Sequence, residues 1–248
     1  MAASGLSRAV RLLVASAVVL PGLVLMSATA EAAGTGAQTA SSVLTAAKSA
    51  IGKQTSVHLE VKSGSGSGSG SSEEDLKADL GKTSGIETIS EGTETVVIKV
   101  TPTDAYLSGD SSGLTKILGL TSAEAKKVGS DWLTLKAGTS QYKTLATSVT
   151  VSSVGSVLPP AKGTHLYAPA PPTKKFYTLK WNTAATSSSP ALTSSLTLSA
   201  VGATLPALET TTAVGAGKQT VALSKWGEHV LVSAPPEGST IPLSKISG

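Results

Sequence analysis

The chain contains no cysteine, and this absence excludes several classes of function at once. It rules out a disulfide framework, a thiol nucleophile, a zinc–thiolate site and a lipid anchor carried on cysteine. Aromatic residues are also scarce, at 3% of the 248 residues, whereas hydrophobic residues make up 40%. We therefore expect an aliphatic core of Leu, Val, Ile and Ala that is stabilised by burial alone.

The chain also lacks an apolar run long enough to span a bilayer. Its longest run, Leu12–Met26, has 15 residues, fewer than the roughly 20 that a spanning helix needs. Two arginines precede this run and Ala30-Glu31-Ala32 follows it, which is the order of a secretory signal peptide. We expect residues 1–32 to be removed during export. The mature protein then begins near Ala33 and lies outside the cytoplasmic membrane, secreted or in the cell envelope, without a lipid anchor.

Strong charge of either sign is missing as well. The formal net charge is +4, and it falls to about +3 when two arginines and Glu31 leave with the signal peptide (4 − 2 + 1). The lysines are dispersed, and no basic stripe alternates with aromatic rings, so we expect no nucleic-acid partner. Peripheral association with an anionic envelope surface stays open.

The 216 residues that follow residue 32 are enough for one domain with a sizeable core. A helical pattern occupies Val43 to Ile51, with Ser41 or Ser42 as its expected N-cap. A second helical region lies between Gly109 and Leu158, interrupted by a brief strand at Trp132, and it includes a capping box at Thr121–Glu124.

Period-two alternation, typical of half-buried strands, surrounds this helical middle. The expected strands are 57–61, a weaker pair within 75–89, and then 94–101, 176–181, 192–201, 208–214, 219–224 and 228–233. A Gly-Ser tract, 63–72, is expected to form a flexible loop, and a proline-rich segment, 159–172, an extended crossover within the same domain. The pattern predicts an α+β fold with a largely antiparallel sheet.

Three local strings, taken with the order of elements, resemble the LppX/LprG family of mycobacterial envelope lipoproteins. They are Ala105–Asp110, Gly129–Trp132 and Lys225–Val232, the last closed by Pro235-Pro236. The resemblance covers roughly Ala40 to Pro236. It implies a half-barrel, a curved antiparallel sheet wrapped over short helices, which encloses an aliphatic cavity for the acyl chains of lipids or glycolipids. The family carries a cysteine at the cleavage site for lipid attachment, and this chain does not.

The candidate lipid-binding residues are alternate apolar residues on the expected inner face of the sheet. They are Val57, Leu59, Val61, Val96, Ile98, Val100, Leu196, Leu198, Val221 and Leu223. Val230 and Val232 are expected on the same face. A contact with lipid is what the resemblance implies for these side chains. From the alternation alone, a filled core in a structural or protein-interaction module is the preferred interpretation.

One string has the form of a catalytic motif. Gly109-Asp110-Ser111-Ser112-Gly113 matches G-x-S-x-G, and His165 and His229 follow it in the order found in serine hydrolases, with Glu209 or Glu228 as conceivable acids. The parallel α/β pattern of that fold is missing, however, so a turn that caps the next helix is the preferred interpretation. A hydrolase using Ser111 is the minor alternative. The three histidines lack metal-ligand spacing, and we expect no catalytic residue, metal site or cofactor.

Overall fold

A computed structural model describes residues 38–64, 74–167, 175–186, 190–213 and 216–246. The expected signal peptide, residues 1–32, lies outside these ranges. So do residues 65–72 of the Gly-Ser tract and residues 168–172 of the proline-rich crossover.

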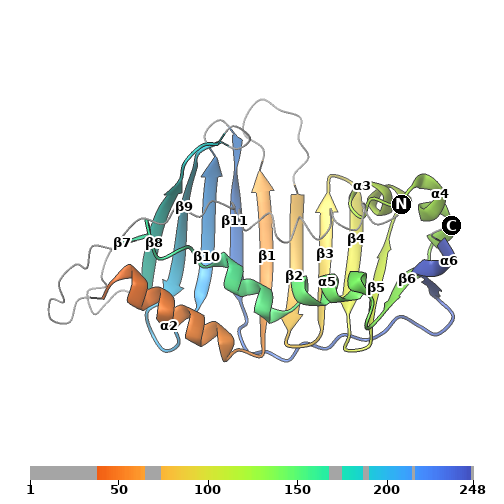
Figure 1. The fold of residues 1–248 in the computed structure, drawn as a ribbon, viewed down its shortest axis with the longest axis horizontal. Coiled ribbons are helices and arrows are strands. Elements are labelled where there is room, and N and C mark those ends of the chain that lie inside the picture. The colour runs from red at the N-terminus through yellow and green to blue at the C-terminus, as the bar shows by residue number, and fades with distance from the viewer. Residues whose placement is uncertain (1–37, 65–73, 168–174, 187–189, 214–215, 247–248) are drawn as a thin grey trace.

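Within the described ranges, twelve strands form one open sheet in the order β12-β6-β5-β4-β3-β2-β1-β11-β10-β9-β8-β7 (Figure 1). Their bounds are β1 Ser56–Gly64, β2 Glu74–Gly81, β3 Gly85–Glu91, β4 Glu94–Val100, β5 Asp104–Gly109, β6 Trp132–Lys136, β7 His165–Tyr167, β8 Phe176–Thr183, β9 Leu192–Ser199, β10 Pro206–Ala213, β11 Ala216–Ser224 and β12 Thr240–Pro242. All neighbours pair antiparallel except β12 and β6, which are parallel. The first strand, β1, lies at the centre and joins two meanders, because it pairs with both β2 and β11.

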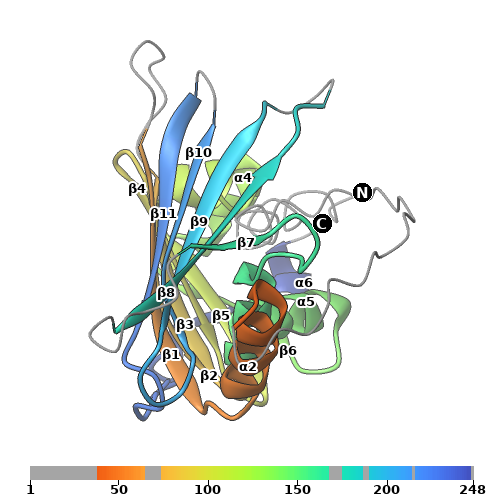
Figure 2. The ribbon, with the colours of Figure 1, turned by 90° about the vertical axis from the view of Figure 1, so that its left-hand side faces the viewer.

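Short helices cover one side of this sheet. They are α2 Ala40–Gly52, α3 Ser111–Lys116, α4 Ser122–Val128, α5 Ser140–Ser148, the 3₁₀ helix η1 Val151–Val157, and α6 Leu243–Ile246. Figure 2 shows the curvature of the sheet, with α2, α5 and α6 on its concave side. The fold class is therefore α+β, a curved half-barrel over short helices, as the sequence predicted. No helix in the described ranges has both the length and the apolar character needed to cross a membrane.

Side-chain caps fix where the helices start. The predicted capping box of α4 is confirmed, since Thr121 accepts from the Glu124 amide and Glu124 accepts from the Thr121 amide. The predicted cap of α2 was wrong by two or three residues. Thr39 is its N-cap and accepts a hydrogen bond of 3.1 Å from the Ser42 amide, while Ser42 completes a capping box by accepting from Thr39. Residues at the caps satisfy backbone donors that a first helical turn leaves free.

Four local expectations differ from the structure. Residues 228–233 form no strand, because positive φ angles at Lys225 (51°) and Gly227 (81°) break the extended backbone after β11. Ser63 and Gly64, expected in the flexible loop, belong to β1. The proline-rich crossover contains an edge strand, β7, which pairs with β8. Strands β5 and β12 were not predicted.

The buried side chains fall into two clusters. The larger one joins β1–β6 and β11 to α3, α4, α5, η1 and α6. The smaller one joins Val43, Leu44 and Ala47 of α2 to Leu179 of β8 and to Leu196 and Leu198 of β9. Only aliphatic residues make up the smaller cluster's fully buried part, and the tyrosine and tryptophan that pack against it are partly exposed. The expectation of an aliphatic core is confirmed for these residues.

Candidate functional site

The candidate site is the concave face of the sheet, onto which all ten predicted residues point. Strand register brings them side by side: Leu59 is opposite Leu223, and Val61 is opposite Val221. Each of the ten is buried, with between 0 and 7% of its surface exposed. Because residues on one face of a strand alternate with those on the other, their polar neighbours, such as Glu60 and Lys62, lie on the convex face.

Register also arranges the concave face into rows that run across the strands. The lower row consists of Leu223, Leu59, Ala78, Glu87, Ile98, Leu107 and Leu133. The upper row consists of Leu196, Glu209, Val221, Val61, Leu76, Ile89 and Val96. Beyond it, toward the upper end of β1 in Figure 1, the rim row consists of Ser194, Thr211, Gln219, Ser63, Glu74, Glu91 and Glu94. The face therefore changes from apolar to polar along the strands.

Glu87 is a carboxylic acid in the middle of the lower row. Its neighbours across the strands are Ala78 of β2 and Ile98 of β4. None of its surface is exposed, and neither carboxyl oxygen has a hydrogen-bond partner among the described residues. Burial raises the pKa of Glu87 to about 8, because an apolar environment penalises the charged form. At neutral pH this side chain is thus mainly a neutral acid that can both donate and accept a hydrogen bond.

A second acid, Glu209, interrupts the upper row. It lies between Leu196 of β9 and Val221 of β11 and is 7% exposed. Burial raises its pKa to about 7, and a hydrogen bond of 3.4 Å from the Thr211 hydroxyl opposes that shift. Because Leu196 belongs to the smaller cluster and Val221 to the larger one, Glu209 lies where the two clusters separate. The ten predicted residues consequently form two apolar patches.

The rim row carries further acids. Burial raises the pKa of Glu74, and the nearby Glu91, directly opposite it, raises the pKa further. At the other side of the rim, Ser194 and Thr211 hydroxyls lie 2.9 Å apart. A polar end of an amphiphile would meet hydrogen-bonding groups here.

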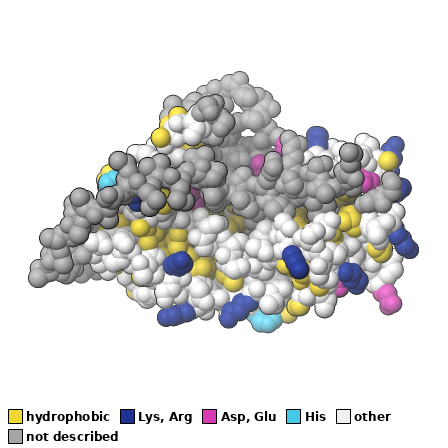
Figure 3. Space-filling view, in the orientation of Figure 1, with side chains coloured by type: hydrophobic (Ala, Val, Ile, Leu, Met, Phe, Trp, Pro, Cys, Tyr) yellow, Lys and Arg dark blue, Asp and Glu magenta, His cyan; other side chains and the backbone are white. Residues whose placement is uncertain are grey.

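The helices approach the sheet unevenly. Their most extensive backbone contacts with the sheet in the described ranges are those of α3 with β4 and β5, of α5 with β5 and β6, and of α6 with β6 and β12. Val149 lies so close to Gly85 of β3 that a side chain at position 85 would overlap the Val149 carbonyl. Buried side chains of β1, β2 and β11 belong to the same cluster as those of these helices. Lysine side chains are scattered over the surface on this side of the molecule (Figure 3).

Two of the hollows beside the described residues are lined mainly by residues other than the ten predicted ones. One, of about 600 Å³, lies between the loop at Pro102 and helix α5, and it includes Tyr142 and Ala146. The other, of about 190 Å³, is lined by His58, Asp79 and His229 among others. Of the ten predicted residues, only Val57 lines either hollow. The side chains of the ten are packed in the structure.

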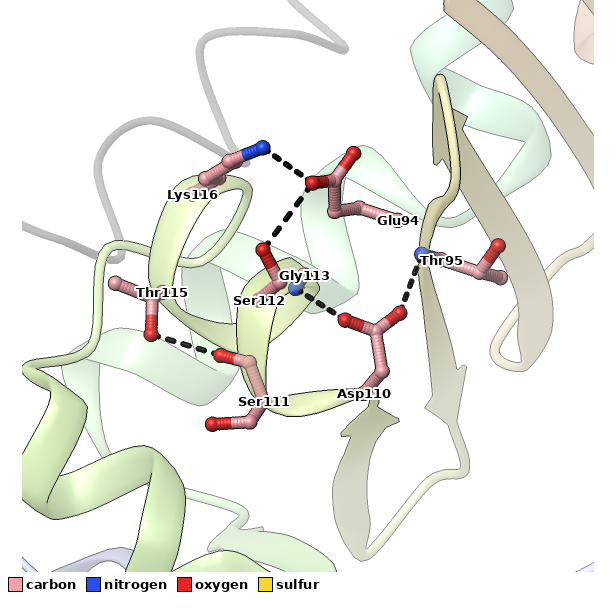
Figure 4. Close-up of polar contacts among 8 residues, drawn as sticks. All are labelled: Glu94, Thr95, Asp110, Ser111, Ser112, Gly113, Thr115 and Lys116. Atoms are coloured by element: carbon pink, nitrogen blue, oxygen red, sulfur yellow. Dashed lines mark hydrogen bonds and ion pairs between the residues drawn. The ribbon is translucent and has the colours of Figure 1, made fainter.

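The G-x-S-x-G string forms the cap of α3 (Figure 4). Asp110 is the N-cap: its carboxylate accepts a hydrogen bond of 2.7 Å from the Gly113 amide and one of 2.9 Å from the Thr95 amide. These bonds lower the pKa of Asp110. The Ser112 hydroxyl donates to Glu94, which is also paired with Lys116. Ser111 lies exposed at the helix start.

Neither candidate histidine lies near Ser111. His165 is on β7, at one edge of the sheet, whereas Ser111 follows β5 near the other edge. His229 lies beside the hollow that contains His58, whose Nδ1 is 2.7 Å from a carboxylate oxygen of Asp79. The structure therefore supports the helix-cap interpretation of the motif. No group of three or more acids and histidines in the described ranges is arranged to hold a metal ion.

Comparison with known proteins gives a likeness of fold. No family model and no curated protein sequence matches the chain. The crystal structure of LprF from Mycobacterium bovis superposes with a TM-score of 0.50 at 14% identity, over 79% of this chain and 96% of that one. The chain has an LppX/LprG-like fold. The lipoprotein LppX of Mycobacterium tuberculosis aligns with a TM-score of 0.42 and 18% identity, over 78% of this chain and 99% of that one.

The sequence analysis did not identify Glu87 and Glu209 as acids on the concave face of this LppX/LprG-like fold. Glu87 lies in a stretch that was predicted only as a weak strand, and Glu209 was considered only as a partner for a catalytic histidine. The signal for Glu87 is present but ambiguous: Ile86 and Ile89 are three residues apart, so they cannot share one face of a strand. Ile89 points inward with Glu87, and Ile86 points outward.

Proposed function

We propose that the protein is an exported, non-enzymatic carrier that binds the acyl chains of a lipid or glycolipid along the concave face of its sheet. The observation that carries the proposal is the pair of mainly aliphatic rows that cross the open sheet from β11 to β4, bounded by a polar rim. The shared half-barrel fold supports it.

In this proposal an acyl chain lies across the strands, along the two rows, with its polar head toward the rim. The ten predicted residues supply contacts in both rows and below them. Burial of each methylene stabilises such a complex by about 0.8 kcal/mol, so a long chain offsets the loss of motion on binding. The ligand enters and leaves at the edge of the sheet, and shielding of the chain from water is the whole mechanism.

A second function is favoured by one specific observation. Because the ten residues are already 0–7% exposed, the same structure suits a structural or protein-interaction module with a filled core. The two functions differ in one measurable respect: a carrier binds an amphiphile reversibly, whereas a filled module does not.

Extraction and uptake distinguish the two. The mature protein, residues 33–248, is purified without detergent, extracted with organic solvent and analysed by mass spectrometry. The extracted protein is then titrated with the fluorescent fatty acid cis-parinaric acid. A co-purified amphiphile and saturable uptake are expected; an extract free of lipid together with no uptake would establish the filled module.

A matched pair of variants locates the binding face. Ala78 lies in the lower row and is 2% exposed, whereas Ala222 of β11 lies half-buried on the convex face. We expect Ala78→Trp to weaken uptake of cis-parinaric acid by about tenfold or more, because an indole ring displaces several methylene contacts. Ala222→Trp should leave it within about twofold. Circular dichroism confirms that both variants are folded, and equal loss in the two would contradict binding on the concave face.

Export is the second part of the proposal. We expect the recovered extracellular protein to begin near Ala33, because small residues at Ala30 and Ala32 fit the specificity of signal peptidase. N-terminal sequencing of protein from the medium and from the envelope fraction tests this. Retention in the cytoplasm with residues 1–32 intact would contradict it.

A further inference from the structure

Exposed large apolar side chains gather at one corner of the convex face. Tyr167 is 51% exposed, Phe176 50%, Val201 67% and Leu208 42%. These are four of the five exposed large hydrophobic residues in the described ranges; the fifth, Leu231, lies in the segment after β11. An isolated exposed apolar residue is ordinary, whereas a group of them on one patch indicates a contact surface.

Strand register shows that these residues belong together. Tyr167 of β7 is opposite Thr178 of β8, and the same row continues through Thr197 of β9 to Leu208 of β10. Phe176 is two residues from Thr178 on the same face, and it is opposite Ser199.

Val201 lies in the same corner. It follows β9 by two residues and is tied back to that strand by hydrogen bonds with Ser199. The Ala200 amide donates a hydrogen bond of 2.8 Å to the Lys175 carbonyl, which places Lys175 beside it. Figure 2 shows the start of β8 on the side of the sheet away from the helices.

The corner is basic as well as apolar. Lys175 and Lys180 are exposed, and the Lys180 ammonium lies 4.7 Å from the centre of the Tyr167 ring. From residue 132 to residue 208 the sequence contains six lysines and no acid. Within the bounds of β7 to β11 there is a single acid, Glu209, and it points into the concave face. No negative charge on these strands therefore offsets the lysines.

We propose that this corner, formed by Tyr167, Phe176, Val201 and Leu208 with Lys175 and Lys180, docks on an anionic lipid bilayer. Aromatic rings of this kind favour the headgroup region of a membrane, and aliphatic side chains insert beside them. Lysine stems reach from such a patch toward lipid phosphates. The uncompensated positive charge selects an anionic surface as the partner.

The docking corner is separate from the proposed lipid-binding face, since one lies on the convex side of the sheet and the other on the concave side. Membrane docking therefore does not rest on the carrier function and is measured without any bound ligand. Together the two would deliver the edge of the half-barrel to a membrane.

Vesicle sedimentation tests the proposal. The mature protein, residues 33–248, is mixed with vesicles of phosphatidylcholine alone, or with about one-third phosphatidylglycerol, at low salt and at about 0.5 M salt, where charges are strongly screened. We expect binding to the anionic vesicles at low salt, with affinity at least about fivefold weaker on the neutral vesicles and at high salt.

Two double variants define the corner. We expect Phe176→Ser with Val201→Ser, and separately Lys175→Gln with Lys180→Gln, to weaken binding by about fivefold or more. Two control variants are changed outside the corner. One, Lys126→Gln with Lys143→Gln, removes the same amount of charge from α4 and α5, and the other, Leu231→Ser, removes an exposed apolar residue. Both should bind the anionic vesicles like the parent. Because all these side chains are exposed, circular dichroism should be unchanged. No binding to either vesicle, or equal loss in the control variants, would overturn the proposal.

Discussion

Glu87 makes the stability of this protein depend on pH. Its pKa is raised to about 8 in the folded state, whereas an unfolded glutamate titrates near its ordinary pKa of 4.5. Between these values the unfolded chain loses a proton that the folded chain keeps, so rising pH favours unfolding. At about 1.4 kcal/mol per pKa unit, the loss between pH 4.5 and 8 is on the order of a few kcal/mol.

We expect Glu87→Gln to remove the part of this pH dependence that Glu87 contributes, because the amide does not ionise, while the part due to Glu209, whose pKa is raised to about 7, remains. Chemical denaturation at pH 5 and pH 8 measures it: both proteins should lose stability at the higher pH, and the variant should lose less than the parent. Glu237→Gln, an exposed position, is the matched control and should behave like the parent. If the stability of the parent did not change between pH 5 and pH 8, Glu87 would not be buried as a neutral acid.

Gly109 is required for close contact between β5 and β4. A Cβ atom there would lie 2.6 Å from the Thr95 carbonyl oxygen, whereas one at Gly155 of η1 would meet nothing within 4 Å. We expect Gly109→Ala to destabilise the protein by about 1–3 kcal/mol through overpacking. Gly155→Ala should be neutral or stabilise by up to about 1 kcal/mol. Thermal unfolding of both variants checks this, and equal effects would contradict it.

The start of helix α2 is fixed by its N-cap residue, Thr39. We expect Thr39→Ala to destabilise the protein by about 1 kcal/mol, because the Ser42 amide loses its acceptor. Ser41, which the sequence suggested as a cap, lies exposed inside the first turn, and Ser41→Ala should be neutral within about 0.5 kcal/mol. Urea denaturation compares the two. A larger effect at Ser41 would contradict the assigned helix start.

Elements with a strict period and good flanking signals could be predicted from the sequence. Strands such as β1 and β4 show clear alternation, and the capping box of α4 is a local signal. Alternation failed at Val230 and Val232, because backbone turns at Lys225 and Gly227 end the extended backbone before this segment begins. The short strands β7 and β12 pair with β8 and β6, and no local pattern encodes these pairings.

Only part of the candidate site could be predicted from the sequence. Which side chains of β1, β4, β9 and β11 face inward follows from period two, and all ten predicted residues do so. What they face was not predictable, because the helices and the acids that complete the concave face come from distant parts of the chain. Glu87 and Glu209 enter the aliphatic rows only through the pairing of β3 with β2 and β4, and of β10 with β9 and β11.

At the scale of the whole molecule, one sheet serves two cores of unequal size. The smaller cluster has six buried residues among those described, from α2, β8 and β9, whereas the larger joins seven strands to most of the helices. Opening of a small hydrophobic cluster exposes less apolar surface and needs less free energy. The β8–β9 side is thus able to open while β1–β5 stay folded, which would admit a ligand at that edge.

Hydrogen exchange measures this difference directly. We expect amides of β8 and β9 to exchange before those of β1–β4, with a lower free energy of opening. Glu209→Leu should join Leu196 to Val221 through aliphatic contacts and stabilise the fold by about 1–3 kcal/mol. The exchange rates of β8–β9 and of β1–β4 should then differ less. Glu60→Leu, on the convex face, should not change their difference. Equal exchange rates on the two sides of the parent, or an unchanged difference between the two sides in Glu209→Leu, would contradict the division of the core at Glu209. Slower uptake of cis-parinaric acid by Glu209→Leu would connect this division to ligand entry.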